Sequence, residues 1–453
     1  MVQSSPHPPG APSAGSAESV LGRETLRKVR LRLLPVIIVL YLIAYLDRNN
    51  VGFAKSALST DLGLSDAAYG LGAGIFFIGY VLMEIPSNAG MYRFGARRWI
   101  ARILISWGII ACAMALVRGE NSFYIIRFLL GAAEAGFFPA VLFYFTLWFP
   151  ARQRVAVLGL FIIAQPVANA FGSPVSGLLL NLDGVGGLHG WQWLFLIEGL
   201  PAIVMGALAP RLLTDRPADA TWLKPQERDW LVRTMDAEAA LKTVHGKHPF
   251  LAGLKDKRAW VYGALNFGMV CGIYGLSLWL PTIVKNMGHY SDTTLGLLVM
   301  IPYAVSIPFV YFWARRADRT GRRALHAAIS LFTAAVGLVS AGYLLSVNPV
   351  LALVLLTVAA IGIYSAIAPF LSMPSAIFAG AAAAAGLGLV NSLGNIGGFV
   401  APYIVGLIKD HTHSDQLALT FLSGCLAVTA VVGYLYANRR PEGNAALDPA
   451  PPT

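Results

Sequence analysis

The sequence has few charged residues and few cysteines. Only 13% of its 453 residues are Asp, Glu, Lys or Arg, whereas about 25% is usual for a soluble domain. The three cysteines match no metal-binding or redox spacing. No metal-ligand cluster, nucleophile elbow or phosphate-binding loop is found either. The sequence therefore predicts neither a metal site nor a bound cofactor, and it gives no support to an enzyme.

Hydrophobic residues make up 56% of the chain, and they gather in twelve apolar stretches. The first covers residues 31–52 and the last 417–437. Each stretch has the length of about 18 residues or more that a membrane-crossing helix needs. Backbone polar groups in lipid must be satisfied within a helix or a closed barrel. The sequence therefore predicts an all-α membrane protein with twelve transmembrane helices.

The net charge of +11 comes from basic residues that follow this topology. With the N-terminus placed in the cytoplasm, 27 Lys and Arg residues lie in inner segments and four in outer loops. Such an asymmetry is the positive-inside rule, so the charge indicates orientation and not a nucleic-acid partner. Both termini are expected in the cytoplasm. Residues 1–30 are expected to form a largely disordered tail, because their first part is rich in Pro, Ser and Gly, and residues 439–453 a second tail.

The two halves of the sequence contain a repeated pattern. The segment RFGARRWI (93–100) has a counterpart in RTGRRALH (319–326), and both contain Arg-x-Gly-x-Arg at an offset of 226 residues. The first and seventh predicted helices begin about the same distance apart, which indicates a duplication. Two six-helix bundles are therefore predicted, over residues 31–212 and 259–438. A cytoplasmic linker with one amphipathic helix, residues 213–258, would join them.

Four charged residues lie inside predicted spans of the first half: Asp47, Arg48, Arg127 and Glu134. A charge at bilayer depth costs about 2.5–3.5 kcal/mol on insertion scales, so such residues usually pair or face a cavity. Arg127 and Glu134 are spaced to share one helix face, while Arg48 offers a planar fork for a carboxylate. Burial favours the protonated form of a carboxyl group, which a proton carrier requires. The alternative is a buried ion-pair network that only fixes helix packing.

Six plus six helices with a long central loop resemble the plan of the major facilitator superfamily. WARRADRTGRRA (313–324) resembles its loop signature, with Ala314 in place of the usual glycine, whereas the first copy has Tyr92 where an acidic residue is expected. The blocks YLDRNNVGFA (45–54), RFLLGAAEAGFFPA (127–140) and NSLGNIGGFVAPYIVG (391–406) resemble the anion:cation symporter family of organic-anion carriers. Within that family the likeness is to bacterial carriers of tartrate, phthalate and similar carboxylates.

The resemblance implies roles for individual residues. Arg48 would hold the substrate carboxylate, Asp47 and Glu134 would carry protons, and Arg127 would be the counter-charge that senses their protonation. Further residues would line the substrate cavity: Tyr45, Tyr80 and Gln165 from the first half, and Tyr274, Ser372, Asn391 and Asn395 from the second. The second loop signature would act in gating through Asp318, Arg319, Gly321 and Arg322.

Two further acidic residues need an interpretation. Glu84, near the inner end of the second span, is interpreted as a gate or loop anchor. Glu198 lies in the middle of the sixth span, and we expect it to form a structural ion pair with a cytoplasmic Arg.

The predicted function is import of an organic carboxylate by proton symport through alternating access. The carrier would be a multi-pass monomer in the inner membrane of a bacterium, with lipid around it and no cofactor, driven by the proton gradient. Sugar acids, tartrate and aromatic acids all fit the residues, and Na⁺ coupling stays open. An efflux carrier or antiporter of the same superfamily is the main alternative, and a polytopic membrane enzyme is a weaker one.

Overall fold

The computed structural model describes residues 14–244, 254–377 and 380–438, and every regular element in these ranges is helical. Three short 3₁₀ turns separate some of the helices. The α-helices discussed below are α1 (Ala14–Leu62), α2 (Asp66–Phe94), α3 (Ala96–Ala113), α4 (Glu120–Glu134), α5 (Phe137–Trp148), α6 (Ala151–Leu180), α7 (Gly190–Leu212), α8 (Pro225–Val244), α10 (Lys257–Asn286), α11 (Asp292–Thr320), α12 (Arg323–Leu344), α13 (Pro349–Ile377), α14 (Gly380–Thr412) and α15 (Asp415–Asn438).

The helices match the predicted transmembrane spans. Within the described residues, 11 helices are long and apolar enough to cross a membrane, with α4 and α5 together forming one of them. These correspond to every predicted span except the fifth, residues 155–180, which lies within α6. The predicted all-α fold is confirmed.

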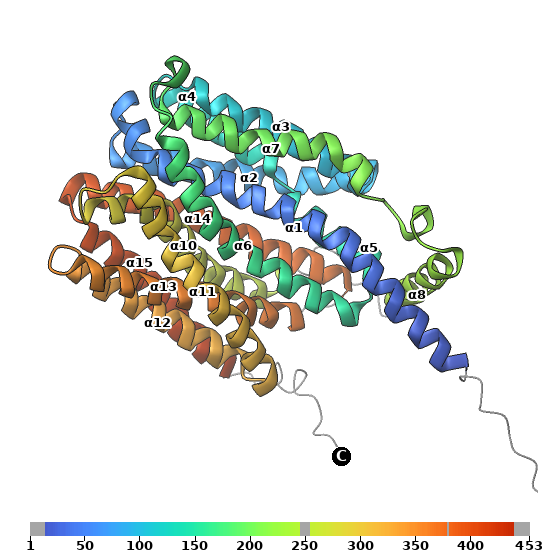
Figure 1. Cartoon of the computed structure of the whole chain (residues 1–453). Coiled ribbons are helices and arrows are strands. Elements are labelled where there is room, and N and C mark those ends of the chain that lie inside the picture. Colours follow the sequence, from blue (N-terminus) through green and yellow to red (C-terminus); the bar gives the residue numbers. More distant parts are fainter. Residues whose placement is uncertain (1–13, 245–253, 378–379, 439–453) are drawn as a thin grey trace, which may run out of the picture.

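Two bundles lie side by side along their lengths (Figure 1). The first contains α1 to α7 and the second α10 to α15, and they meet where α2 packs on α14, α6 on α11 and α1 on α10. Small residues allow these close approaches. A Cβ atom added to Gly177 of α6 would lie 2.4 Å from Asp292 O at the start of α11. The backbones of the two bundles therefore touch directly at this point.

The N-terminal prediction needs a correction. Residues 14–30 were expected to belong to a largely disordered tail, but they form the first turns of α1, which runs without interruption to Leu62. The reason is a partner for this end of the helix: α1 packs on α8, Lys28 pairs with Glu227, and Leu26 and Val29 are buried. Residues 1–13 of the predicted tail, 245–253 of the predicted linker and the tail 439–453 lie outside the described residues.

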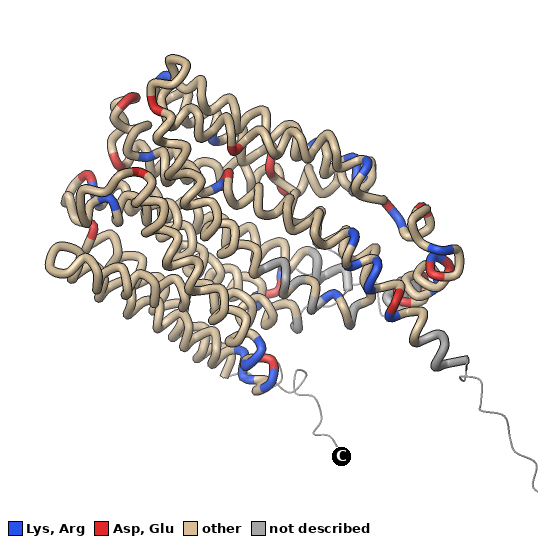
Figure 2. The backbone as a smooth tube through the Cα atoms, in the orientation of Figure 1, with Lys and Arg blue, Asp and Glu red and all other residues tan. Residues whose placement is uncertain are grey.

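The end of the molecule that carries α8 is also rich in basic residues (Figure 2). We call it the linker end and the other the distal end. The first loop signature lies at the linker end, where Asp215, just after α7, accepts a hydrogen bond from the Arg97 backbone N–H at 2.9 Å. The same carboxylate lies 3.4 Å from the Arg97 side chain. The loop signature has Tyr92 where an acidic residue is expected, and Asp215 thus places a carboxylate beside this loop.

The fourth predicted span is broken next to one of its charged residues. Helix α4 ends at Glu134 and α5 begins at Phe137, because Gly136 adopts φ +86° between them. A left-handed conformation of this kind favours glycine. A Cβ atom at this position would also lie 2.2 Å from the Ser87 hydroxyl of α2. The break leaves Glu134 at a helix end inside the bundle, an arrangement used by transporters with discontinuous helices.

Candidate substrate site between the two bundles

Arg48 lies at the boundary between the bundles and bonds to both of them. Its Nη2 forms an ion pair with Glu134 Oε1 of α4, in its own bundle. Its Nη1 donates a hydrogen bond of 2.7 Å to the Tyr274 hydroxyl of α10, in the other bundle. The Arg48 side chain is 11% exposed, and its Nε has no hydrogen-bond partner among the described residues. The guanidinium is therefore buried, and its Nε–H group lacks a hydrogen-bond acceptor among the described residues.

The position of this contact follows from the duplication. Arg48 and Tyr274 are 226 residues apart, the same offset that separates the two loop signatures. Equivalent positions of two repeats meet at the axis that relates them, and in transporters of duplicated fold the substrate site lies at the repeat interface. The Arg48–Tyr274 pair therefore marks the centre of the molecule.

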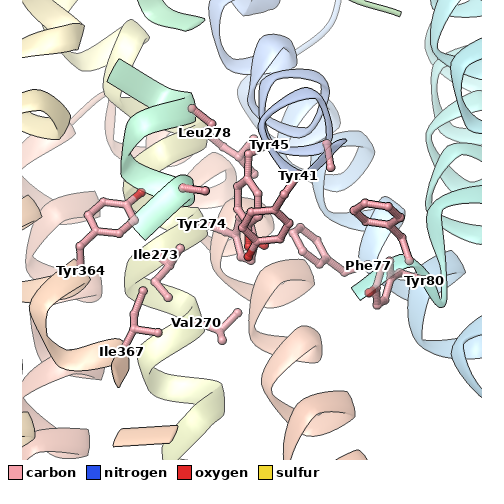
Figure 3. Packing of buried hydrophobic residues seen from close by; sticks show 14 of the residues in the cluster. Tyr41, Tyr45, Phe77, Tyr80, Val270, Ile273, Tyr274, Leu278, Tyr364 and Ile367 are labelled. Atoms are coloured by element: carbon pink, nitrogen blue, oxygen red, sulfur yellow. The ribbon is translucent and has the colours of Figure 1, made fainter. Parts of the chain in front are cut away.

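Aromatic rings enclose the Arg48 guanidinium. Its central carbon lies 5.2 Å from the ring centres of Tyr45 and Phe76, and 5.5 Å from that of Tyr80. Figure 3 shows Tyr41 and Tyr45 converging with Tyr274, and Tyr80 on the adjoining side. A cation over an aromatic face is attracted by the ring quadrupole, most strongly when it is desolvated. The rings stabilise the positive charge without neutralising it, which keeps it available to an anion.

Asp47 points away from Arg48 toward α3. The indole Nε1 of Trp107 donates to Asp47 Oδ2 at 2.6 Å, and Asn50 Nδ2 donates to Oδ1 at 3.4 Å. Asp47 is 1% exposed. The two consecutive charged residues thus have separate partners, as their angular separation on the helix predicts.

Arg127 differs from its predicted placement. It is fully buried, and its Nε and Nη2 donate to Gly72 O at 3.3 Å and Ala73 O at 3.1 Å on α2. Among the described residues it forms no ion pair with Asp47 or Glu134, although its charge acts on both. Glu134 has Arg48 as its direct partner instead. The sensing role of Arg127 remains a prediction.

The predicted lining residues divide into two groups. Tyr45, Tyr80 and Tyr274 surround Arg48, as described above. None of the others forms a hydrogen bond with Arg48 among the described residues: Gln165 is buried on α6, Ser372 donates to Pro369 O of its own helix at 2.7 Å, and Asn395 is half-buried on α14. Asn391 donates to Glu84 Oε1 at 2.7 Å. A part of these four residues in the substrate site remains a prediction.

Both ends of the interface between the bundles are bridged by polar contacts. Toward the linker end, Glu84 of α2 accepts hydrogen bonds from Asn391 and from Ser392 of α14, the latter at 3.2 Å. At the distal end, Asp410 of α14 accepts from the backbone N–H groups of Asp66 and Ala67, both at 2.8 Å. The Arg48 site lies between these two closures.

Two ion pairs, each within one bundle, lie beside the distal closure. Lys55 of α1 lies 2.5 Å from Asp66, and Lys409 pairs with Asp415. Both ammonium groups face the Trp279 ring of α10, at 5.0 and 5.3 Å from its centre. Helices of both bundles thus meet in one charged cluster.

The second loop signature contains one long ion pair. Asp318 pairs with Arg323 at 3.6 Å, not with Arg319 or Arg322, and Gly321 ends α11 with φ +67°. The Asp318 side chain is 64% exposed. A gating role for this loop remains a prediction.

Several residues near the site carried no clear signal in the sequence. Trp107 is one of ten tryptophans, so nothing distinguished the one that binds Asp47. Asn169 of α6 accepts from Asn49 at 2.7 Å and donates to Tyr364 of α13 at 3.0 Å, linking the bundles. The only feature that could have identified Asn169 in the sequence is its position as a polar residue inside an apolar span.

A multi-pass helical protein with a buried cationic site on its repeat axis has the architecture of a membrane transporter. The family model described as Major Facilitator Superfamily matches residues 37–402 and 286–451. The chain belongs to this superfamily and is a secondary transporter of a small molecule, not an enzyme.

Two relatives are similar over nearly their whole length. The chain is 46% identical over 431 residues to a protein of Agrobacterium vitis named "Putative tartrate transporter", covering 95% of this chain and 99% of that one. It is 42% identical over 414 residues to a "Quinolone resistance transporter" of Acinetobacter baumannii, covering 91% and 95%. The inward-open xylose transporter XylE of E. coli is similar in fold, with a TM-score of 0.72, 15% identity, and coverage of 92% and 99%.

Proposed function

We propose that this protein imports a small organic carboxylate together with protons. The observation that carries the proposal is the shared Arg48, whose guanidinium is held by Glu134 on one side and by Tyr274 on the other. A substrate carboxylate is an acceptor of the same chemistry as Glu134. The two therefore compete for one cation, and competition of this kind couples substrate binding to a proton.

The coupling works through the charge of Glu134. While Glu134 is ionised, its ion pair occupies Arg48 Nη2. Protonation removes the negative charge, so the ion pair is lost and the guanidinium is free to bind the substrate in a bidentate manner. Release of substrate on the other side restores the ion pair as the proton leaves. Asp47, held by Trp107 and Asn50, is the second proton carrier.

Tartrate is the first substrate to test. Two acidic groups with hydroxyls between them match a site that offers one guanidinium and several phenol groups. The A. vitis relative, by its name, suggests the same class. We further propose a bacterial inner-membrane location with the linker end in the cytoplasm, where the basic residues place it. The carrier would act as a monomer, driven by the proton gradient alone.

The test begins with a thermal-shift screen of the purified protein against tartrate, sugar acids and aromatic acids. The best ligand is then followed in proteoliposomes with and without an inward proton gradient. Wild-type protein should accumulate it only with the gradient. Glu134→Gln, which mimics the protonated state, should exchange internal for external substrate but should not concentrate it. Accumulation by Glu134→Gln at the wild-type level would refute the coupling scheme.

Export is the second candidate function, and the A. baumannii relative favours it by its name. An antiporter would exchange its substrate for a proton at the same acidic groups. The direction of proton movement separates the two functions. Alkalinisation of the outer medium on adding substrate to energised cells supports symport, and acidification supports antiport.

A further inference from the structure

Glu198 is a buried acidic residue that the proposed cycle does not use. It lies on α7 and is 6% exposed. Ser176 of α6 donates its hydroxyl to Glu198 Oε1 at 2.7 Å, while Oε2 has no hydrogen-bond partner among the described residues. The ion pair with an Arg that the sequence suggested is absent from these residues. Burial without a counter-charge favours the neutral, protonated form of a carboxyl group.

A polar cavity lies on the other side of Ser176. It is small, with room for about one water molecule, and runs between α1, α6, α10 and α11. Its polar lining consists of Asn49, Asn50, Asn169, Ser173, Ser176 and Ser277. Ser176 is therefore both a wall residue of the cavity and the hydrogen-bond donor to Glu198.

The cavity has unsatisfied acceptors that water would satisfy. Asn49 Oδ1, Asn50 Oδ1 and Ser277 Oγ are buried and have no hydrogen-bond partner among the described residues. Buried polar groups in native proteins are nearly always bonded to protein or to ordered water. A polar space with several such partners is the kind of site that holds water molecules. The cavity can thus bring water to within one hydroxyl group of Glu198.

Glu198 is also linked to the proton-coupling residue Asp47. Asn50 hydrogen-bonds to Asp47 Oδ1 and, like Ser176, belongs to the cavity wall. Asp47 is close enough to act on Glu198 electrostatically. Cys112 of α3, whose thiol donates to Leu196 O at 3.7 Å, is a further titratable group against this part of α7. Glu198 and Asp47 are therefore both linked to the cavity, Glu198 through Ser176 and Asp47 through Asn50.

We propose that Glu198 is a second proton-binding site, which passes protons between the hydrated cavity and Asp47. This inference rests on the proton symport proposed above. A proton from the external solution reaches the cavity water, which passes one proton to the Ser176 hydroxyl and remains neutral. Ser176 in turn donates its own proton to the Glu198 carboxylate. Glu198 then gives a proton to ionised Asp47 and becomes a carboxylate again. The summed charge of the two carboxyl groups does not change in this second step.

The first experiment uses infrared spectroscopy of the purified full-length chain and needs no substrate. At neutral pH, wild-type protein should show a carbonyl band from a protonated carboxyl group that Glu198→Gln lacks. Ser176→Ala should shift the frequency of this band, because it removes the hydrogen bond to Oε1. Ser423→Ala is the matched control: this buried serine also bridges two helices, donating to Ala335 O at 2.7 Å, but lies on α15. Spectra of wild type and Glu198→Gln with the same carboxyl bands would overturn the proposal.

The second experiment measures proton influx on adding tartrate to proteoliposomes that contain a pH-sensitive dye. Glu198→Gln should slow this influx at least tenfold while tartrate exchange stays within twofold of wild type. Wild-type influx in this variant would overturn the proposal, and so would an equal loss of exchange, which would mean a structural role. A wild-type protein that takes up tartrate with Na⁺ and without protons would refute proton symport itself. Normal influx in Asp47→Asn would also overturn the proposal, because Asp47 is the group to which Glu198 passes its proton.

Discussion

Replacing Arg48 with Lys tests whether the geometry of the guanidinium, and not only its charge, holds the substrate. Arg48 uses two different nitrogens for Glu134 and Tyr274 and has a third, Nε, without a partner. A lysine ammonium is a point charge on a flexible stem and cannot reproduce this planar fork. The variant keeps the positive charge, so the bundle does not acquire an unpaired Glu134.

The expected loss of substrate affinity can be estimated from the free energy of a hydrogen bond to a charged group. One such bond contributes about 1.5–3 kcal/mol, and each 1.4 kcal/mol corresponds to about a tenfold change in binding. Losing one of the two bonds to a carboxylate should therefore weaken binding by roughly 10- to 150-fold. Binding of the ligand found in the thermal-shift screen would be measured by calorimetry on purified protein. Uptake would be measured in parallel.

Two controls make this result interpretable. Arg102→Lys changes an exposed arginine of α3 in the same way and should bind as wild type. Tyr274→Phe removes only the hydroxyl that Arg48 contacts and should have a smaller effect than Arg48→Lys. If Arg48→Lys binds within threefold of wild type, the substrate carboxylate does not use the fork and the assigned site is wrong.

Three further changes test separate features. Trp107→Phe removes the indole donor to charged Asp47, a hydrogen bond that contributes about 1.5 kcal/mol. Substrate accumulation should therefore fall about tenfold while substrate exchange persists. An equal loss of accumulation and exchange would contradict this prediction. Gly136→Ala should destabilise the protein by roughly 1–3 kcal/mol through backbone strain, seen as a lower Tm, whereas Gly388→Ala, with open space around it, should not. Asp215→Ala should cost about 1 kcal/mol, the usual value of a helix cap. Asp215→Asn, which keeps an acceptor for the Arg97 N–H, should cost clearly less, and equal Tm values for the two variants would argue against capping.

The fold could be predicted from the sequence because lipid leaves few alternatives. Apolar length alone defines a membrane helix, so the spans were found without any tertiary information. The extension of α1 was missed because it depends on a partner distant in sequence, α8, which buries Leu26 and Val29. The break after Glu134 had a visible signal in Gly136, but glycine inside a span is as often a packing residue as a break.

The sequence predicted which charged residues belong to the candidate site, but not which of them pair with one another. A charged residue inside an apolar span is conspicuous, so Asp47, Arg48, Arg127 and Glu134 were all found. Which of them pair depends on how α1 and α4 cross, and no local pattern encodes this. Sequence spacing places Arg127 and Glu134 on one helix face, yet Arg127 bonds to α2 backbone carbonyls and Arg48 takes Glu134. Helix geometry fixes neighbours within a helix and not across helices.

The two closures of the bundle interface differ in their number of contacts, and this difference has a consequence for the transport cycle. The distal closure combines the Asp410 helix cap with the hydrogen bond from Tyr69 to Leu278 O and with Lys55 of α1 over the Trp279 ring of α10. The linker-end closure consists of one carboxylate, Glu84, and two neutral donors. The closure with fewer contacts should break first, so the protein at rest should open more readily toward the linker end. Glu84→Gln weakens that closure further by turning two charge-assisted hydrogen bonds into neutral ones, which are about half as strong. We expect a thiol reagent to reach Asn395→Cys, one turn along α14 from Asn391, faster in the Glu84→Gln background from the linker-end side. Equal labelling rates in the two backgrounds would show that Glu84 does not hold this end closed.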